Sequence, residues 1–237
     1  MKDNIIPQGK WSFDENVSDC FEDMLSRSIP QYEVMRESSA NLVHDVISPW
    51  ASENNFFILD IGCSDGLMIE KLLNKFDEKG IYTGIDISEP MLEKAKCRFK
   101  DNDNVSIRNC DLRTDFPNTA YNAITSILSI QFTPIEYRQH IIQEIYDHLY
   151  LNGCFIMVEK VLGNTDKINK LFVDNYYDMK KQNGYTEEQI ERKRLSLEGV
   201  LVPVTSDWNI DLLKQAGFRQ VDVFWKWMNF VGYIAIK

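Results

Sequence analysis

Residues 56–75 constrain the fold of this chain more strongly than any other segment. Phe56–Ile61 is apolar apart from Asp60, as expected of a strand that is covered on both faces. Gly62 and Gly66 then permit a tight turn and a close approach of the backbone to a ligand, and the residues that follow have the composition of a helix. A glycine turn between a buried strand and a helix is typical of a nucleotide site at the carboxyl end of a parallel strand.

The acid before this turn argues against a dinucleotide. Ser64 stands where the dinucleotide fingerprint has its middle glycine, and Asp60 precedes the first glycine. A carboxylate repels a pyrophosphate but attracts a cation. S-adenosylmethionine (SAM) has an ammonium and a sulfonium and no phosphate, so the pattern favours SAM as the ligand. An ordinary strand-to-helix turn is the alternative, because a short glycine turn is weak evidence by itself.

The rest of the chain alternates strands with helices. We expect strands at 81–85, 105–109, 123–127 and 154–158, and helices at 67–75, 90–98 and 134–150. This alternation predicts an α/β fold with a mainly parallel sheet and right-handed crossovers. A helix at 207–216 and two closely spaced strands at 220–225 and 230–236 follow, which predicts a C-terminal β-hairpin at the sheet edge.

Helices are also expected outside this alternating core. Two of them, at 11–28 and 32–50, precede the first strand, and a charged, aromatic-rich helical insertion spans 165–199. We therefore expect an N-terminal helical extension over residues 1–55 and a ligand-binding domain over residues 56–237 that contains the insertion.

Composition narrows the class of partner. The chain has 237 residues and a net charge of −10, which favours a small-molecule substrate and argues against stable nucleic-acid binding. No apolar run is long enough for a membrane span. Five widely spaced cysteines and three histidines without ligand spacing argue against a disulfide framework or a metal site, and we expect a cytoplasmic protein with reduced thiols.

Two further acids end the next two strands. Asp86 lies 26 positions after Asp60 at the tip of the second strand, where an acid can accept hydrogen bonds from both ribose hydroxyls. The alternative is that Asp86 caps the next helix, although Ser88 suits that role better. Asp111 follows the third strand and could accept from an adenine amino group. Three acids that end three successive strands point together to an adenosyl ligand without phosphates.

At the level of these motifs the chain resembles class I SAM-dependent methyltransferases, and most closely the carboxy-S-adenosyl-L-methionine (carboxy-SAM) synthases. The glycine turn is common to the whole class. The narrower resemblance runs from Trp11 to the C-terminus and rests on these segments: 11–15, 27–32, 60–64, 183–185, 193–194 and 229–230. It implies a Rossmann-like fold with a seven-stranded, mainly parallel sheet and a homodimer, with SAM or carboxy-SAM as the bound species.

The resemblance also implies roles for individual residues. The cofactor contacts of the family fall on Tyr32, Asp60, Gly62, Cys63, Ser64, Asp86, Ile87, Asp111 and Leu112. Its arginine that pairs with the extra carboxylate, and that the partner subunit supplies, falls on Arg194. We expect Arg194 and Tyr32 to position the reacting ligands, with no dedicated base. Without the resemblance, the favoured interpretation of Arg194 is a position on a solvated helix rich in ion pairs between residues four apart.

One cofactor position departs from the family. Ile127 stands where the family has an asparagine, and isoleucine has no side-chain hydrogen-bonding group. Either only the backbone acts there, or the pocket is altered and the protein is a paralogue that alkylates another acceptor, for which Ser129 and Gln131 could supply polar groups. Trp208, Trp225 and Trp227 could line an acceptor pocket, although core or dimer contacts are the commoner role of such residues.

The resemblance implies the reaction of SAM with prephenate to give carboxy-SAM and phenylpyruvate, in the pathway of tRNA wobble-uridine modification. The first alternative is a SAM-dependent methyltransferase of a different acceptor. Since the sulfonium is already activated, such an enzyme depends mostly on alignment and desolvation and needs no nucleophile–base motif. The second alternative is a non-catalytic SAM-binding partner protein.

Overall fold

The fold is built on one twisted sheet. The computed structural model describes residues 1–51, 55–76 and 80–237. The sheet order is β3-β2-β1-β4-β5-β8-β7, in which neighbouring strands among the first five are parallel and β8 is antiparallel to both β5 and β7. The strands are β1 (Phe56–Ile61), β2 (Gly80–Asp86), β3 (Val105–Asn109), β4 (Tyr121–Ile127), β5 (Leu149–Leu162), β7 (Gln220–Trp227) and β8 (Phe230–Ile236).

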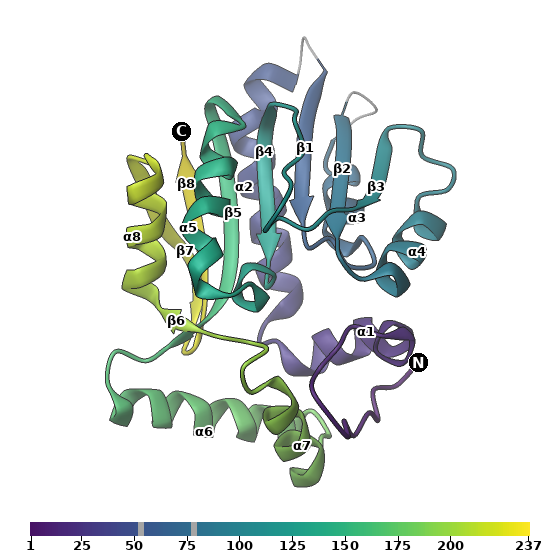
Figure 1. The fold of residues 1–237 in the computed structure, drawn as a ribbon, viewed down its shortest axis with the longest axis vertical. Helices are drawn as coiled ribbons and strands as arrows, with labels where there is room; N and C mark the ends of the chain where they lie inside the picture. The colour runs from purple at the N-terminus through teal and green to yellow at the C-terminus, as the bar shows by residue number, and fades with distance from the viewer. Residues whose placement is uncertain (52–54, 77–79) are drawn as a thin grey trace.

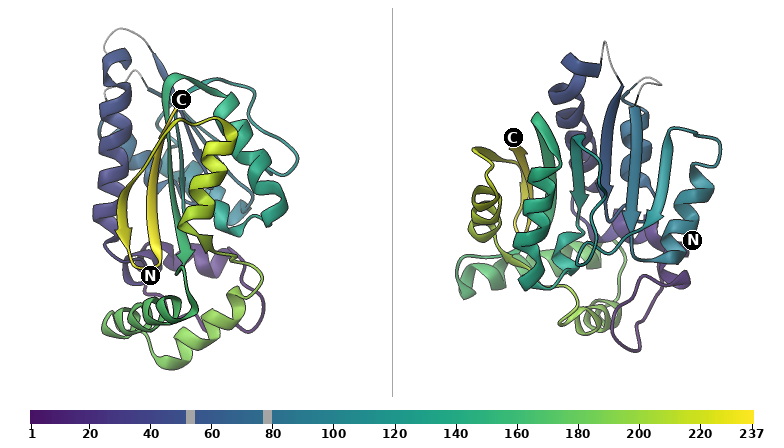
Figure 2. Two further views of the ribbon diagram at one scale, coloured as in Figure 1. Left: turned by 90° about the vertical axis from the view of Figure 1, so that its left-hand side faces the viewer. Right: turned by 45° about the horizontal axis from the view of Figure 1, so that its top comes forward.

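Helices cover both faces of the sheet because its central strands are apolar on both sides. One face packs on α2 (Tyr32–Ala51), α3 (Leu67–Leu73) and α4 (Glu89–Arg98), and the other on α5 (Ile135–Asp147) and α8 (Ser206–Ala216). In β1 successive residues alternate between the two cores, so Ile58 faces the first group of helices and Leu59 the second. Figure 2 shows the two layers on either side of the sheet.

A helical cap lies beyond the carboxyl ends of the parallel strands. It consists of α1 (Glu15–Ser28) together with α6 (Asp166–Gln182) and α7 (Glu187–Leu197) of the insertion, below the sheet in Figure 1. Segments far apart in sequence join here: the Trp11 amide donates to the Ser196 carbonyl at 2.9 Å, and the Arg27 guanidinium donates to the Asn183 carbonyl at 2.9 Å. The N-terminal segment and the insertion therefore form one cover over one end of the sheet.

The predicted α/β class, the mainly parallel seven-stranded path and the C-terminal hairpin are confirmed. The final strand β8 lies inside the sheet, and β7 forms the edge. The structure adds a two-residue strand, β6 (Val204–Thr205), paired with β5. Asp14 caps α1, because its carboxylate accepts from the Val17 amide at 3.0 Å.

Several predicted boundaries are wrong: the first helix, expected from residue 11, begins at Glu15, and the strand expected at 154–158 spans Leu149–Leu162. The helix expected at 134–150 ends at Asp147, because the chain must already be extended at Leu149 to pair with Tyr121 in the sheet. The helical insertion expected at 165–199 is interrupted after Gln182, where Gly184 adopts a φ of 86° that suits glycine and ends the helix. Among the described residues, no helix is both long and apolar enough to cross a bilayer.

A buried arginine ties the loop after β4 to the insertion. Arg138 on α5 is only 2% exposed, and its guanidinium donates to the carbonyls of Thr133 at 2.9 Å, Gln131 at 3.1 Å and Val202 at 2.8 Å. Glu159 on β5 is also buried. Burial raises the pKa of Glu159 to about 8, although the charge of Arg138 favours its ionised form.

We expect the Arg138→Met variant to lose about 2–4 kcal/mol of unfolding free energy, because three buried carbonyls lose a charged donor. Urea denaturation measures this loss, with Arg192→Met on the exposed face of α7 as the control that stays within about 0.5 kcal/mol of the wild type. Equal stabilities for the two variants would contradict the role assigned to Arg138.

Candidate functional site

A cavity of about 480 Å³ lies between the carboxyl ends of the parallel strands and the helical cap. It is lined mostly by apolar groups, with charged side chains at both ends. All the predicted site residues that we named from the sequence lie along this one cavity: Tyr32, Asp60, Gly62, Cys63, Ser64, Asp86, Ile87, Asp111, Leu112, Ile127 and Arg194. The fold thus brings together residues from the start of α2, from the ends of four strands and the turns after them, and from α7 of the insertion.

The glycine turn is shaped by contacts as well as by backbone conformation. Gly62 has a φ of 64°, and a Cβ atom there would lie 1.9 Å from the Ser129 hydroxyl oxygen on the loop after β4. Gly66 has a φ of 89°, and its Cβ would lie 2.4 Å from the Phe99 ring. Glycine is therefore required at both positions for conformation and for space, and the turn is held directly against the loop after β4.

Asp86 fixes this turn through backbone hydrogen bonds. One oxygen of its carboxylate accepts from the amides of Ile87 at 2.7 Å and Ser88 at 2.9 Å, and the other accepts from the Ser64 amide at 3.0 Å. The second oxygen retains capacity for a ligand hydroxyl. The alternative role of Asp86 as a helix cap is wrong, because the Ser88 side chain caps α4. Burial raises the pKa of Asp86 despite these three bonds.

Asp60 is the most deeply buried acid of the cavity, at 2% exposed. Its carboxylate accepts from the Thr125 hydroxyl at 2.7 Å. Burial raises the pKa of Asp60 to about 7, and the neighbouring Asp86 carboxylate adds to the rise, while the Thr125 bond opposes it. Two acids with raised pKa values side by side create a position that a cationic ligand would stabilise.

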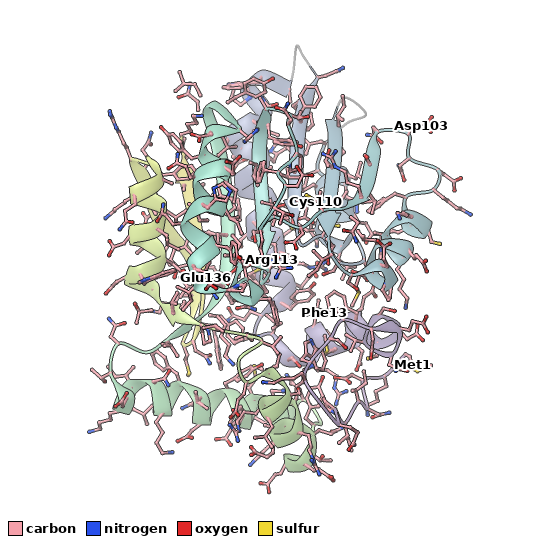
Figure 3. All side chains as sticks on the ribbon, in the orientation of Figure 1. Met1, Phe13, Asp103, Cys110, Arg113 and Glu136 are labelled. Atoms are coloured by element: carbon pink, nitrogen blue, oxygen red, sulfur yellow. The ribbon has the colours of Figure 1, made fainter. Side chains whose placement is uncertain are left out.

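The third predicted acid is already paired. The Asp111 carboxylate accepts from the Arg113 guanidinium at 2.9 and 3.0 Å, and these bonds lower the pKa of Asp111. Arg113, labelled in Figure 3, also lines the cavity. Ile87 is 63% exposed at the rim, whereas Leu112 packs against the core. Recognition of an adenine amino group by Asp111 would require sharing this carboxylate with Arg113.

Tyr32 begins α2, and its ring lies under the guanidinium of Arg36, 4.6 Å from the ring centroid. Burial raises the pKa of the Tyr32 hydroxyl. Ile127 ends β4 and packs with apolar neighbours of both α2 and the cap. Gln131 lines the cavity but is held by the backbone, since its side chain accepts from the Lys160 amide at 2.7 Å and donates to the Leu128 carbonyl at 3.2 Å.

Arg194 projects from α7 into the same cavity of its own chain. Its guanidinium donates to the Glu191 carboxylate at 2.7 and 2.9 Å and to the Glu198 carboxylate at 2.6 Å. These hydrogen bonds raise the pKa of Arg194. The structure therefore combines features of both interpretations of Arg194. The residue lines the cavity, and its guanidinium is also paired with carboxylates along its own helix.

Sequence reasoning missed a group of lysines in the cavity wall. Lys160 lies near the carboxyl end of β5, Lys180 lies on α6 and Lys193 lies on α7. Burial lowers the pKa of Lys160 to about 8, of Lys180 to about 7 and of Lys193 to about 8. The sequence signals for these lysines are weak: Lys160 follows Glu159 after the apolar part of a strand, and Lys193 lies in a segment that carries the family resemblance. Lysines in charged helices are normally on the surface.

The aromatic lining also differs from the sequence-based suggestion. Trp208, Trp225 and Trp227 do not line the cavity but pack in or against the apolar cores, so the acceptor-pocket interpretation of these residues is wrong. The cavity instead has these aromatic residues in its wall: Trp11, Phe13, Phe21, Tyr32, Phe132, Tyr176, Tyr177 and Phe230. Phe13, labelled in Figure 3, lies on the segment that leads into α1. The N-terminal segment thus closes the cavity.

Comparisons with known proteins agree with this geometry. Residues 58–153 match the family model described as a methyltransferase domain. The chain is 39% identical over 233 residues to carboxy-S-adenosyl-L-methionine synthase of Methylococcus capsulatus (96% of this chain, 93% of the relative), and 37% identical over 241 residues to that of Nautilia profundicola (100% of both).

Solved structures of similar fold are more distant in sequence. The CurJ carbon methyltransferase gives a TM-score of 0.69 at 13% identity and covers 94% of this chain and 61% of its own. Human N-acetylserotonin methyltransferase, solved with SAM, gives 0.58 at 15% identity and covers 94% and 55%. These likenesses show the class I methyltransferase fold.

The raised pKa of Asp60 predicts a pH dependence of stability. Below about pH 4 the carboxyl is neutral in both folded and unfolded chains; between about 4 and 7 only the unfolded chain ionises, so stability is lost as the pH rises towards 7. The Asp60→Asn variant has no carboxyl at this position and therefore lacks this pH-dependent contribution to stability. The stability of the wild type relative to the variant should therefore fall by about 2–4 kcal/mol from pH 4 to pH 8.

Urea denaturation of both proteins across this range measures the difference, in which the similar contribution of Glu159 cancels. Asp222→Asn, which changes an exposed acid on β7, is the matched control and should show no such trend. A constant difference between the wild type and Asp60→Asn would contradict the assigned pKa.

Proposed function

This chain belongs to the carboxy-S-adenosyl-L-methionine synthase family, and on that basis we propose that it converts SAM and prephenate into carboxy-SAM and phenylpyruvate. It is a SAM-dependent transferase of class I methyltransferase fold. The observation that supports the proposed reaction best is the charge distribution of the cavity. Two acids with raised pKa values lie at the glycine turn, and an arginine lines the same cavity.

The residues present fit SAM. Asp60 can pair with the ammonium of its methionine portion, since a cation there would offset the cost of ionising a buried carboxyl. Asp86 has an acceptor position left for the ribose hydroxyls, and Gly62 allows the turn to pack closely against Ser129 at the edge of the cavity. Cys63, Ser64, Ile87, Asp111, Leu112 and Ile127 are proposed as further cofactor contacts, on their positions along the cavity and the family resemblance.

In the proposed reaction the methyl carbon of SAM gains the carboxyl group that prephenate loses. The proton released from that carbon and the hydroxide released from prephenate account for one water, and phenylpyruvate leaves. The chain would hold both ligands in line and exclude water with its cap, and Arg194 and Tyr32 would position the reacting groups. A guanidinium suits the new carboxylate because it donates two parallel hydrogen bonds.

We further propose that the protein acts in the cytoplasm as a homodimer and that its product serves tRNA wobble-uridine modification. The family resemblance supports these assignments. The net charge of −10 fits an enzyme that supplies a small molecule rather than one that grips the tRNA itself.

A second function is favoured by Ile127. Because isoleucine replaces the polar residue of the family at the end of β4, the pocket is more apolar there, and a SAM-dependent methyltransferase with another acceptor is the alternative. The mass of the ligand extracted from the protein, after its purification from a bacterial host, distinguishes these two functions. A mass one carboxyl group heavier than SAM, followed by turnover of SAM and prephenate, supports the synthase, whereas SAM alone with no turnover favours the methyltransferase.

The Asp86→Ala variant should lose most SAM affinity, by about tenfold to a hundredfold, because the ribose hydroxyls lose a charged acceptor and the Ser64 amide is released. Isothermal titration calorimetry with SAM measures this. Asp222→Ala is the matched control, since Asp222 is exposed and its carboxylate likewise accepts from the next amide at 2.7 Å. Unchanged SAM binding by Asp86→Ala would exclude Asp86 from the ribose site.

The Arg194→Ala variant should weaken binding of carboxy-SAM about tenfold or more and leave SAM binding within about threefold, because only carboxy-SAM has the extra carboxylate. Titration of both ligands measures the ratio, with Arg192→Ala on the same helix as control. Equal losses for the two ligands would make Arg194 a structural residue.

Mixed dimers show which subunit supplies the arginine. If Arg194 acts across the dimer, a mixture of Arg194→Ala and Asp86→Ala subunits regains turnover that neither variant has alone. If it acts within its own chain, as its place in the cavity suggests, the mixture stays inactive.

A further inference from the structure

Three lysines line the part of the cavity next to the helical cap, and two of them lie on its helices α6 and α7. Lys160 comes from near the carboxyl end of β5, Lys180 from α6 and Lys193 from α7, so three elements separated in sequence direct a positive group to one region. The charges of Lys160 and Lys193 both contribute to the lowered pKa of Lys180, which places the three within electrostatic reach of one another. Like charges are gathered here although they repel.

Aromatic rings rather than carboxylates contact these ammonium groups. Lys160 lies 4.7 Å from the ring centroid of Tyr176, Lys180 lies 4.9 Å from that of Tyr185, and Lys193 lies 4.3 Å from that of Trp11. Within residues 1–51, 55–76 and 80–237, no hydrogen bond or ion pair is formed by any of the three side chains. Cation–π contacts leave the charge itself unneutralised.

Surface lysines of the same helices behave differently. Lys170 and Lys181 on α6 pair with Asp174 and Glu187 at 2.7 and 2.8 Å. Lys180, by contrast, is 4% exposed and has no such partner. Lys160 and Lys193 are half-buried. A poorly solvated ammonium without an anion is unstable, so the three together indicate an anionic ligand that completes the site.

The nearby charged groups offset only part of this positive charge, because one carboxylate faces three lysines. Asp3 is the carboxylate that acts on Lys180 and Lys193, but it is already held by the Tyr185 hydroxyl at 2.5 Å and by the Ile5 amide at 3.0 Å. Arg27 adds further positive charge beside Lys180. The Cys20 thiol beside Lys193 has a raised pKa of about 11 and stays neutral.

The apolar wall between the lysines defines the rest of the ligand. Tyr176 and Phe230 contact each other with ring centroids 5.3 Å apart, and Lys160 lies over both rings. Tyr176 is also within 5.7 Å of Lys180. A ligand that reaches more than one lysine therefore lies across aromatic surface, which suits an unsaturated ring with an anionic group at each end.

We propose that Lys160, Lys180 and Lys193 form the subsite for a small cyclic dicarboxylate, the second substrate of this enzyme. This assignment rests on the proposed function and extends it, since it names the residues that recognise the carboxyl donor. Opposite charges then occupy opposite ends of the cavity: the cationic ligand lies at Asp60 and Asp86, and the dianion at the lysines.

The test is calorimetric titration of prephenate into the protein saturated with S-adenosylhomocysteine, which has no methyl group and so blocks turnover. Lys160→Met, Lys180→Met and Lys193→Met should each weaken prephenate binding about tenfold to a hundredfold. Lys170→Met is the matched control and should bind as the wild type does. Affinity for S-adenosylhomocysteine should stay within about twofold in every variant, which verifies the fold and the cofactor half of the site.

A comparison of two ligands on the wild-type protein tests the proposal without any variant. Prephenate, a dianion, should bind at least about tenfold tighter than phenylpyruvate, a monoanion. Equal affinities would overturn the proposal, as would lysine variants that lose S-adenosylhomocysteine and not prephenate, because the lysines would then hold the carboxylate of the methionine portion.

The two proposals fail separately. Lysine-dependent prephenate binding without formation of carboxy-SAM would retain the subsite and exclude the synthase reaction. Formation of carboxy-SAM with an unchanged KM for prephenate in all three variants would retain the reaction and exclude the subsite.

Discussion

Asp60 and Asp86 end two adjacent parallel strands with carboxylates whose ionised forms burial disfavours. The site depends on this pair, because the same Asp86 carboxylate that needs a ligand also holds the glycine turn through the Ser64 amide. The glycine turn also packs against Ser129 on the loop after β4. A ligand that supplies positive charge between these acids would stabilise both the strand ends and the turn.

The cap gives the opposite end of the cavity its chemistry. Two helices of the insertion and the N-terminal segment cover the strand ends (Figure 1), and they contribute lysines and aromatic rings to the cavity wall. Arg138 and Glu159 fix the loop between these halves, since the arginine bonds to carbonyls of that loop and of the chain after α7. The fold thus holds buried acids and lysines in the wall of one cavity, which suits the joining of a sulfonium compound to an anion.

The sequence alone predicted the parallel sheet and the residues at its strand ends, because the sequence signals for these features are local. Apolar strands followed by helices identify a parallel sheet, and Gly62, Asp60 and Asp86 are found from their places at strand ends. The pairing of Asp111 with Arg113 and the position of β8 inside the sheet depend on tertiary contacts that have no periodic signature. The lysines were missed for the same reason: Lys180 sits in a charged helix, and only packing against Tyr176 and Tyr185 shows that it is buried.

The central claim is that one cavity holds a cationic ligand at its acidic end and a carboxylate at its basic end. A crystal structure with carboxy-SAM bound tests this claim most directly. The account predicts ribose hydroxyls within hydrogen-bond distance of the Asp86 carboxylate and the added carboxylate within hydrogen-bond distance of an Arg194 guanidinium. A ligand that turns its added carboxylate towards Asp60, or that binds outside this cavity, would contradict it.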